Sequence, residues 1–182
     1  MKRQGFVVID TETTGGGPDA RVIEIGVVFL SERGSREAHF TTLLRGEGSG
    51  GHWAARKKHR IRDEDLAPAP SFGELAPAFL RAIQGRIMFA HNSSFDEAQI
   101  NQELRRVRRR RIGNFGCTLG LGIHLGYGRM SLDKAVKRFG LSRDASHVAL
   151  ADADAAANLL KHYMKHNPAE FREYLLVQRL YG

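Results

Sequence analysis

The sequence has one cysteine, no internal repeat and no long hydrophobic run. Because Cys117 is alone among 182 residues, no internal disulfide can form, and a reducing compartment is expected. The first apolar run, Phe6–Ile9, ends at Asp10 and is too short for the core of a signal peptide or for a membrane span. These absences predict a cytoplasmic protein with no membrane association.

The chain also lacks a linker long enough to divide it. Its 182 residues, 42% of them hydrophobic, suffice for a sizeable core and are too apolar for a disordered chain. We therefore expect one domain covering residues 1–182.

Acidic residues are fewer than basic ones, and the formal net charge is +8. The excess is concentrated in two runs, which we call the 56–62 cluster (RKKHRIR) and the 105–111 cluster (RRVRRRR). A charge run is more often a solvated face than a binding site. Two such runs, together with the paired acids described below, favour nucleic acid as the partner.

Local patterns predict an α/β fold. Apolar and β-branched runs predict five strands, at 6–13, 21–30, 37–44, 86–90 and, at the sheet edge, 112–118. The first strand is expected to form a hairpin with the second, and the second with the third. The fourth strand is expected to join the sheet by a crossover. Helical periodicity and capping residues predict helices that begin at Ser71, near Ser93, at Ser131, at Ser146 and at Pro168. Residues 45–70 are expected to be irregular, with a short helical turn at 63–65.

Two carboxylates, Asp10 and Glu12, follow the first apolar run. Side chains alternate along a strand, so both acids point to one face and Thr11 points to the other. Adjacent acids at the end of a buried strand repel each other unless a cation lies between them, and hard oxygen ligands suit Mg²⁺ or Mn²⁺. The alternative is a strand that simply runs into a polar turn. Glu24, in the second strand, is expected to have a structural role.

Two further acids stand in short motifs. Asp96 is the last residue of the motif HNSSFD, which follows the fourth strand, and sites in α/β sheets gather at strand ends. The alternative is an ordinary acid in the first turn of a helix, where the helix dipole favours negative charge. His147 precedes Asp152 by five positions, and Asp154 competes with Asp152. Two positions on a helix are about 200° apart, so one of these aspartates faces the other acids and the second faces away. The spacing from the histidine favours Asp152.

Together, VVIDTETTG, AHNSSFD and SHVALADA resemble the motifs of the DnaQ-like exonucleases of the DEDDh group. The resemblance implies a ribonuclease-H-like fold, with a mixed five-stranded sheet flanked by helices. It implies two divalent ions, bridged by Asp10, with Glu12 and Asp152 on one ion and Asp96 on the other. His147 is then the general base, a role that suits imidazole near neutral pH.

The resemblance also assigns substrate contacts to Thr13, Asn92 and Phe95. Relatives carry a bulky apolar residue where this chain has Gly16 and Gly17, so a contact from Phe95 to the terminal base is expected instead. The chain ends at Gly182 without the tail that binds a polymerase, which predicts a free-standing enzyme.

The expected function is a metal-dependent 3′–5′ exonuclease that acts on single-stranded 3′ ends of DNA and releases nucleoside 5′-monophosphates. One alternative is an RNA-trimming enzyme of the ribonuclease T type, which acts as a homodimer. The other is a catalytically silent nucleic-acid-binding module. The mutually repelling acids argue against the silent module, because binding alone does not need them.

Overall fold

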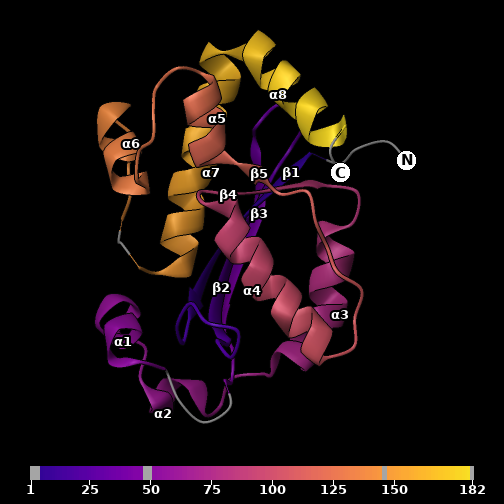
Figure 1. Ribbon diagram of the computed structural model, residues 1–182, viewed down its shortest axis with the longest axis vertical. Coiled ribbons are helices and arrows are strands. Elements are labelled where there is room, and N and C mark those ends of the chain that lie inside the picture. The colour runs from indigo at the N-terminus through magenta and orange to yellow at the C-terminus, as the bar shows by residue number, and fades with distance from the viewer. Residues whose placement is uncertain (1–4, 47–50, 145–146, 181–182) are drawn as a thin grey trace.

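A five-stranded mixed sheet lies at the centre of the computed structural model, which describes residues 5–46, 51–144 and 147–180 (Figure 1). The sheet has the order β3-β2-β1-β4-β5. Its strands are β1 (Phe6–Thr13), β2 (Val22–Leu30), β3 (Arg36–Leu43), β4 (Ile87–Ala90) and β5 (Gly116–Cys117). β1, β2 and β3 are antiparallel neighbours, whereas β4 is parallel to β1 and β5 is parallel to β4. The two predicted hairpins and the predicted crossover are therefore confirmed.

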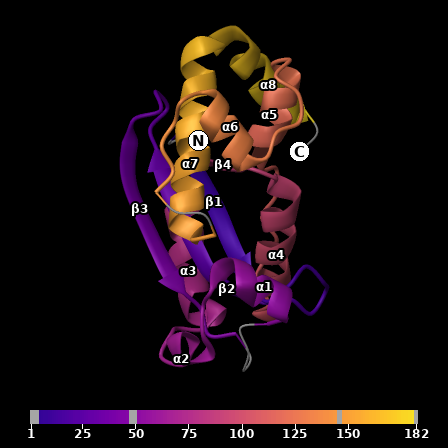
Figure 2. The same ribbon diagram turned by 90° about the vertical axis from the view of Figure 1, so that its left-hand side faces the viewer.

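Helices cover both faces of this sheet (Figures 1 and 2). One face packs against α3 (Phe72–Ile83) and α4 (Ser93–Arg106), and the other packs against α7 (Ala149–His166) with its neighbours. Those neighbours are α5 (Thr118–His124), α6 (Leu132–Arg138) and α8 (Pro168–Leu180). The short helices α1 (Trp53–His59) and α2 (Asp63–Leu66) lie beyond the carboxyl end of β1.

The apolar run in β1 is buried on both sides. Phe6 and Val8 belong to the core beneath α7, and Val7 and Ile9 belong to the core beneath α3 and α4. Burial on both faces explains why the run is continuously apolar rather than alternating. Each such side chain contributes about 1.5–3 kcal/mol when it leaves water, so the strand that carries Asp10 is held firmly.

The start of α7 lies directly against β2. A Cβ at Gly26 would overlap the backbone of Ala149 and Leu150, so glycine is required for this approach. The carboxylate of Glu24 accepts hydrogen bonds from the Ala149 backbone N–H at 3.2 Å and from Thr41 Oγ1 at 3.3 Å. Glu24 thus satisfies a free N–H of the first helical turn and fixes the helix to the sheet. This contact gives Glu24 the structural role that was predicted for it.

Several boundaries differ from the sequence predictions. α1 forms within a stretch expected to be irregular, and α5 replaces the end of the predicted fifth strand, of which β5 keeps two residues. The capping box of Ser71 and Glu74 is present as predicted. The predicted helix start at Ser146 lies outside the described residues, and α7 begins at Ala149.

In the described part of the chain, no helix is both long enough and apolar enough to cross a membrane.

Candidate active site

A cleft of about 690 Å³ opens at the carboxyl end of β1, between α4, α7 and α1. It is lined by every residue that the sequence assigned to the site, namely Asp10, Glu12, Thr13, Asn92, Phe95, Asp96, His147 and Asp152. These residues come from three distant segments. The structure therefore brings the three sequence motifs together in one place.

Asp10 and Glu12 lie on the sheet face that carries α7. Glu12 is directly opposite Glu24 of β2. Burial raises the pKa of Asp10 well above its ordinary value, and the carboxylates of Asp96, Asp152 and Glu12 raise it further. Burial, followed by the charges of Asp152 and Glu24, raises the pKa of Glu12 to about 7. The two acids of β1 thus lie in a negative field with little water to screen it.

Asp96, in the first turn of α4, reaches across to β1. One carboxylate oxygen accepts hydrogen bonds from the Thr11 backbone N–H at 3.0 Å and from Thr11 Oγ1 at 2.8 Å. Thr11 points to the α4 side, opposite to its acidic neighbours, as the strand alternation predicts. Burial raises the pKa of Asp96 to about 7, even though both Thr11 hydrogen bonds act to lower it. Asp96 is therefore a site carboxylate and not only a helix-dipole acid.

Asp152 faces the cleft and Asp154 does not. Asp152 is 5% exposed, and it accepts hydrogen bonds from the His147 backbone N–H at 3.1 Å and from Arg143 Nε at 2.7 Å. Asp154 instead pairs with Arg36 of β3 at 3.1 Å on the surface. The choice of Asp152 over Asp154, made from spacing and helical rotation, agrees with these contacts.

His147 is exposed at the rim of the cleft, just before α7. Its backbone is left-handed, with φ of 60°, a conformation that is uncommon outside glycine and is found at functional sites. Ligand atoms of Glu12, His147 and Asp152 all lie within 4.8 Å of one another. The imidazole therefore reaches the acids while remaining open to water.

Two other histidines that line the cleft, His91 and His59, are less free to exchange a proton than His147. His91 Nδ1 bonds Thr118 Oγ1 at 2.9 Å, and its Nε2 bonds the Met130 carbonyl at 3.1 Å. Burial lowers the pKa of His91, which disfavours its charged form. His59 is buried, and its Nδ1 accepts from the Ile61 N–H at 3.0 Å. His147 is therefore the histidine best placed to exchange a proton in the cleft.

The donor set suits hard divalent cations. Oxygen donors from four carboxylates converge in one cleft, and burial raises the pKa values of Asp10, Glu12 and Asp96, with neighbouring carboxylates raising those of Asp10 and Glu12 further. Divalent ions with oxygen ligands supply positive charge that offsets such carboxylates.

These pKa values predict how the stability of the metal-free protein depends on pH. Glu12 and Asp96 titrate near 7 when folded, against ordinary values of 4.5 and 3.8, so the folded state holds more protons between about pH 4 and 7. The free energy of unfolding should therefore fall as pH rises through this window. In EDTA, we expect the melting temperature to increase when the pH is lowered from about 8 to 6.

Thermal denaturation across this range, with and without excess Mn²⁺, checks the prediction. Asp96→Asn is the control, because it removes one of the two groups and should flatten the dependence. A melting temperature in EDTA that rises with pH for the wild-type protein would contradict the assignment.

Arg143 is a site residue that the sequence did not reveal. Its side chain is 9% exposed and pairs with both Asp152 and Asp133. Because its guanidinium competes with a metal ion for an Asp152 oxygen, we expect Arg143→Gln to bind Mn²⁺ several-fold more tightly. The same change should lower the melting temperature in EDTA. Isothermal titration and thermal denaturation measure the two effects, and weaker Mn²⁺ binding by the variant would count against this role.

The predicted substrate contacts differ in how free their side chains are. Thr13 Oγ1 donates to the Gly15 carbonyl at 2.8 Å, so this hydroxyl is already engaged. Asn92 is exposed at the start of α4 and makes no side-chain cap. Phe95 is half-buried on the wall of the cleft. Asn92 and Phe95 are thus the more accessible of the three.

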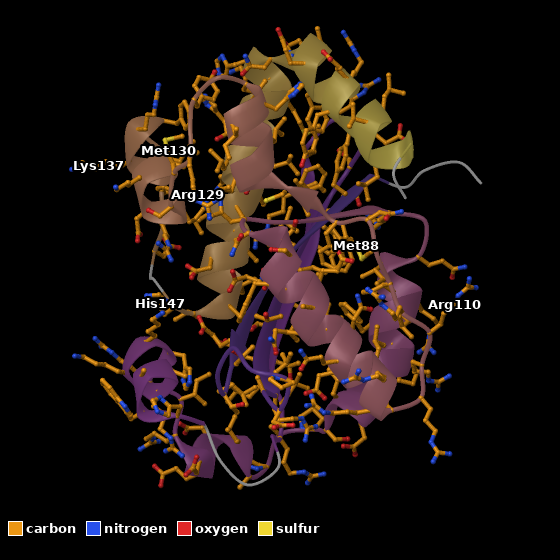
Figure 3. The ribbon with its side chains drawn as sticks, in the orientation of Figure 1. Met88, Arg110, Arg129, Met130, Lys137 and His147 are labelled. Atoms are coloured by element: carbon orange, nitrogen blue, oxygen red, sulfur yellow. The ribbon has the colours of Figure 1, made fainter. Side chains whose placement is uncertain are left out.

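The two basic clusters lie in different places. Lys58 of the 56–62 cluster lines the cleft, and its charge acts to lower the pKa of Glu12. In the 105–111 cluster, Arg106 is a structural residue, because it pairs with the buried Glu103 and donates to the Ala20 carbonyl. Figure 3 shows Arg110 on the opposite side of the view from His147. The 56–62 cluster is therefore the one beside the acids.

Comparison with known proteins gives consistent matches. The family model described as "Exonuclease" matches residues 7–160. DNA polymerase III subunit epsilon of Treponema pallidum is 30% identical over 172 residues, covering 89% of this chain and 79% of its own length. Among solved structures, exonuclease X in complex with 5′-overhanging duplex DNA has a TM-score of 0.70 and 26% identity, covering 90% of this chain and 93% of that one. The nuclease domain of 3′hExo, a DEDDh family member bound to rAMP, has a TM-score of 0.72 and 17% identity, covering 89% and 92%.

A ribonuclease-H-like sheet with converging carboxylates and a histidine at the end of its central strand defines a metal-dependent nuclease. The chain belongs to the exonuclease family and it is a 3′–5′ exonuclease, and the solved DEDDh nuclease domain shares its fold. The family, the fold and the enzyme class expected from the sequence are thereby confirmed.

Proposed function

We propose that this enzyme hydrolyses the terminal phosphodiester at single-stranded 3′ ends of DNA and releases nucleoside 5′-monophosphates. The observation that carries the proposal is the convergence of Asp10, Glu12, Asp96 and Asp152 with His147 in one cleft. DNA is favoured over RNA because DNA is named for the two relatives of at least 25% identity described above. Residues 1–182 would act as one domain in the cytoplasm.

Each side chain has a proposed task that follows from its position. The four carboxylates would hold two Mg²⁺ or Mn²⁺ ions, and such ions would supply an activated water and charge stabilisation for the leaving oxygen. Asp10, which feels the charges of Asp96, Asp152 and Glu12, would be a ligand shared by both ions. His147, exposed beside Glu12 and Asp152, takes the proton of the attacking water. Phe95 and Asn92 contact the terminal nucleotide, and Lys58 contacts a phosphate.

Three hydrogen bonds support these tasks. Thr11 fixes Asp96 with two hydrogen bonds, and Glu24 fixes the start of the helix that carries Asp152. Carboxylates that repel one another are thus held in place by bonds to the backbone of neighbouring elements. Such preorganisation keeps the ligands near one geometry before substrate arrives.

The test is a nuclease assay with end-labelled single-stranded DNA and RNA of matched sequence. Each is incubated with Mg²⁺, Mn²⁺ or EDTA, and the products are resolved by length. We expect DNA shortened from its 3′ end one nucleotide at a time with either metal, and no cleavage in EDTA. Faster cleavage of RNA would transfer the proposal to RNA trimming, and binding without cleavage in every condition would indicate a silent binding module.

A further inference from the structure

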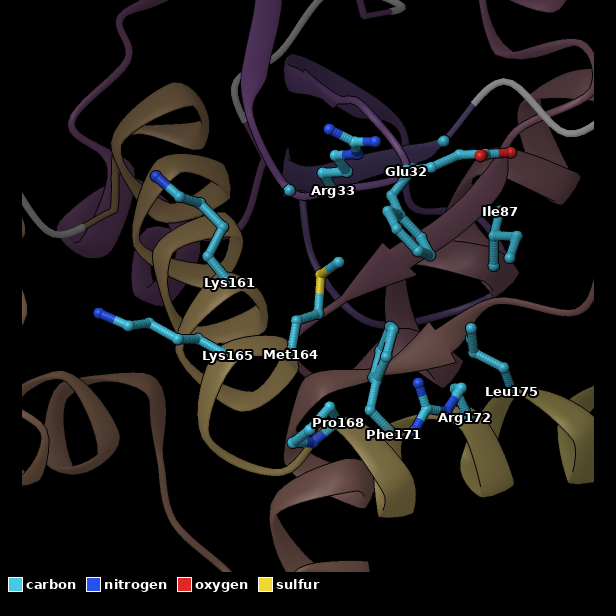
Figure 4. A pocket seen from close by; sticks show the side chains of 13 residues that line it. Glu32, Arg33, Ile87, Lys161, Met164, Lys165, Pro168, Phe171, Arg172 and Leu175 are labelled. Atoms are coloured by element: carbon cyan, nitrogen blue, oxygen red, sulfur yellow. The ribbon is translucent and has the colours of Figure 1, made fainter.

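A second hollow lies at the opposite end of β1 from the active site (Figure 4). Its volume is about 660 Å³, and it lies between the β2–β3 turn, β4, α7 and α8. Phe6 and Ile87, at the starts of β1 and β4, line it, whereas Asp10 and Glu12 lie toward the other end of β1. We call this hollow the α7–α8 groove. A molecule bound in the α7–α8 groove would therefore not block the active-site cleft.

The floor of the groove is apolar. It is formed by Phe6, Ile87, Met164, Phe171 and Leu175, and Figure 4 shows Met164 and Phe171 pointing into the hollow from α7 and α8. α8 also carries Leu176, which follows Leu175 of the floor and is 55% exposed. Large apolar side chains that remain in water beside a hollow mark an interaction surface.

The rim of the groove is positively charged. Arg33, Lys161, Lys165 and Arg172 surround it, against the single carboxylate of Glu32. Within the described residues, none of these four cations forms an ion pair. Their charges are therefore available to a ligand, and they favour an anionic one.

We propose that the α7–α8 groove binds an acidic segment of a partner protein that places large apolar side chains against Met164 and Phe171. The apolar floor selects for aliphatic or aromatic side chains, and the rim selects for Asp and Glu beside them. This interaction surface is separate from the nuclease site and does not depend on the nuclease activity.

The same surface is poorly suited to nucleic acid. Binding of single strands uses exposed aromatic faces on which bases stack. Phe6 and Phe171 are each 5% exposed and pack edge-to-face at 5.7 Å, so neither offers a free face. The floor therefore matches side chains of a protein better than bases.

A second copy of this chain is also a weaker fit. Its acidic run at 63–65 is engaged, because Arg56 pairs with Asp63 and Arg62 pairs with Asp65. Leu66, which follows that run, is buried in its own chain. The charges of this acidic run are thus already neutralised by arginines of the same chain, which favours a different protein as the partner.

The experiment measures fluorescence anisotropy of a short labelled peptide rich in Asp and Glu, with Leu and Phe at its centre. Two control peptides replace either the acidic residues by Gln or the Leu and Phe by Ala. The groove variant is the double change Lys161→Glu and Lys165→Glu. Its matched control is Arg109→Glu with Arg110→Glu, which alters the net charge equally on another exposed surface.

We expect micromolar binding of the acidic apolar peptide, about tenfold weaker binding by the groove variant, and a change of less than about twofold for the control variant. Both control peptides should bind more weakly, and nuclease turnover should be the same in the wild type and in the groove variant. Absence of binding, or equal loss in both variants, would overturn the proposal. So would tighter, lysine-dependent binding of oligo-dT, or a lysine-dependent dimer of the protein alone in light scattering.

Discussion

Asp152→Asn is expected to lower turnover on the order of 10³-fold, whereas Asp154→Asn should retain nearly full activity. The two positions lie on the same helix and receive the same isosteric change. Asp152 is buried in the cleft, between the His147 N–H and Arg143, and its lost charge removes a proposed metal ligand. Within the described residues, Asp154 pairs with Arg36 at the surface, an interaction worth at most about 1 kcal/mol of stability.

Initial rates at saturating single-stranded DNA and Mg²⁺ give the comparison, and isothermal titration with Mn²⁺ shows whether metal binding is lost. Circular dichroism confirms that both variants are folded. In EDTA, Asp152→Asn also removes the carboxylate charge that pairs with Arg143, so the melting temperature of this variant should not exceed that of the wild type. Equal losses of turnover at the two positions would refute the assignment of Asp152.

His147→Asn should lower turnover by about 10²–10⁴-fold near neutral pH, with Mn²⁺ binding weakened much less. Asparagine tolerates the left-handed backbone that His147 adopts, so this variant removes the imidazole with little added strain. The deficit should shrink as pH rises, because hydroxide from solvent then replaces the missing base. This pH dependence separates a proton acceptor from a residue that only shapes the loop.

His52→Asn is the matched control, since His52 also lines the cleft and stands at the N-cap of α1, where asparagine is favoured. Its turnover should stay within a few-fold of wild type at every pH. Rates measured at several pH values for the three proteins give the result. A His147→Asn deficit that is constant with pH would mean that the histidine acts through metal or loop geometry instead.

The strands and longer helices were predictable because their signals are local. The run Phe6–Ile9 is buried on both faces, and the box of Ser71 and Glu74 starts α3, as the sequence suggested. α1 was missed because it has no apolar stripe: Trp53 is 68% exposed and His59 is its one buried residue. α5 was missed because glycines weaken helix signals. Gly122 is there because a Cβ would approach the Tyr163 hydroxyl to 2.8 Å.

The sequence points to members of the candidate site wherever a motif is contiguous, and it gives no sign of the contacts that depend on the tertiary structure. Asp10, Asp96 and Asp152 each stand in a short recognisable motif. The bond from Ala149 to Glu24 joins residues 125 positions apart, and no spacing in the sequence indicates it. Arg143 likewise has no motif, and its role follows from its two acidic partners in the folded protein.

Gly26 lies directly opposite Asp10 in the β1–β2 pair but does not line the cleft, and a substitution there would disturb the site without touching substrate. A methyl group there would push the start of α7 away from β2, because the obstacle is helix backbone and not a flexible side chain. His147 and Asp152 would move with it, while Asp10 and Glu12 stayed on the sheet. A displacement of about 1 Å between catalytic groups costs on the order of 10²-fold in rate. Random mutagenesis selecting for folded but inactive protein should therefore recover substitutions at this glycine alongside the acids themselves.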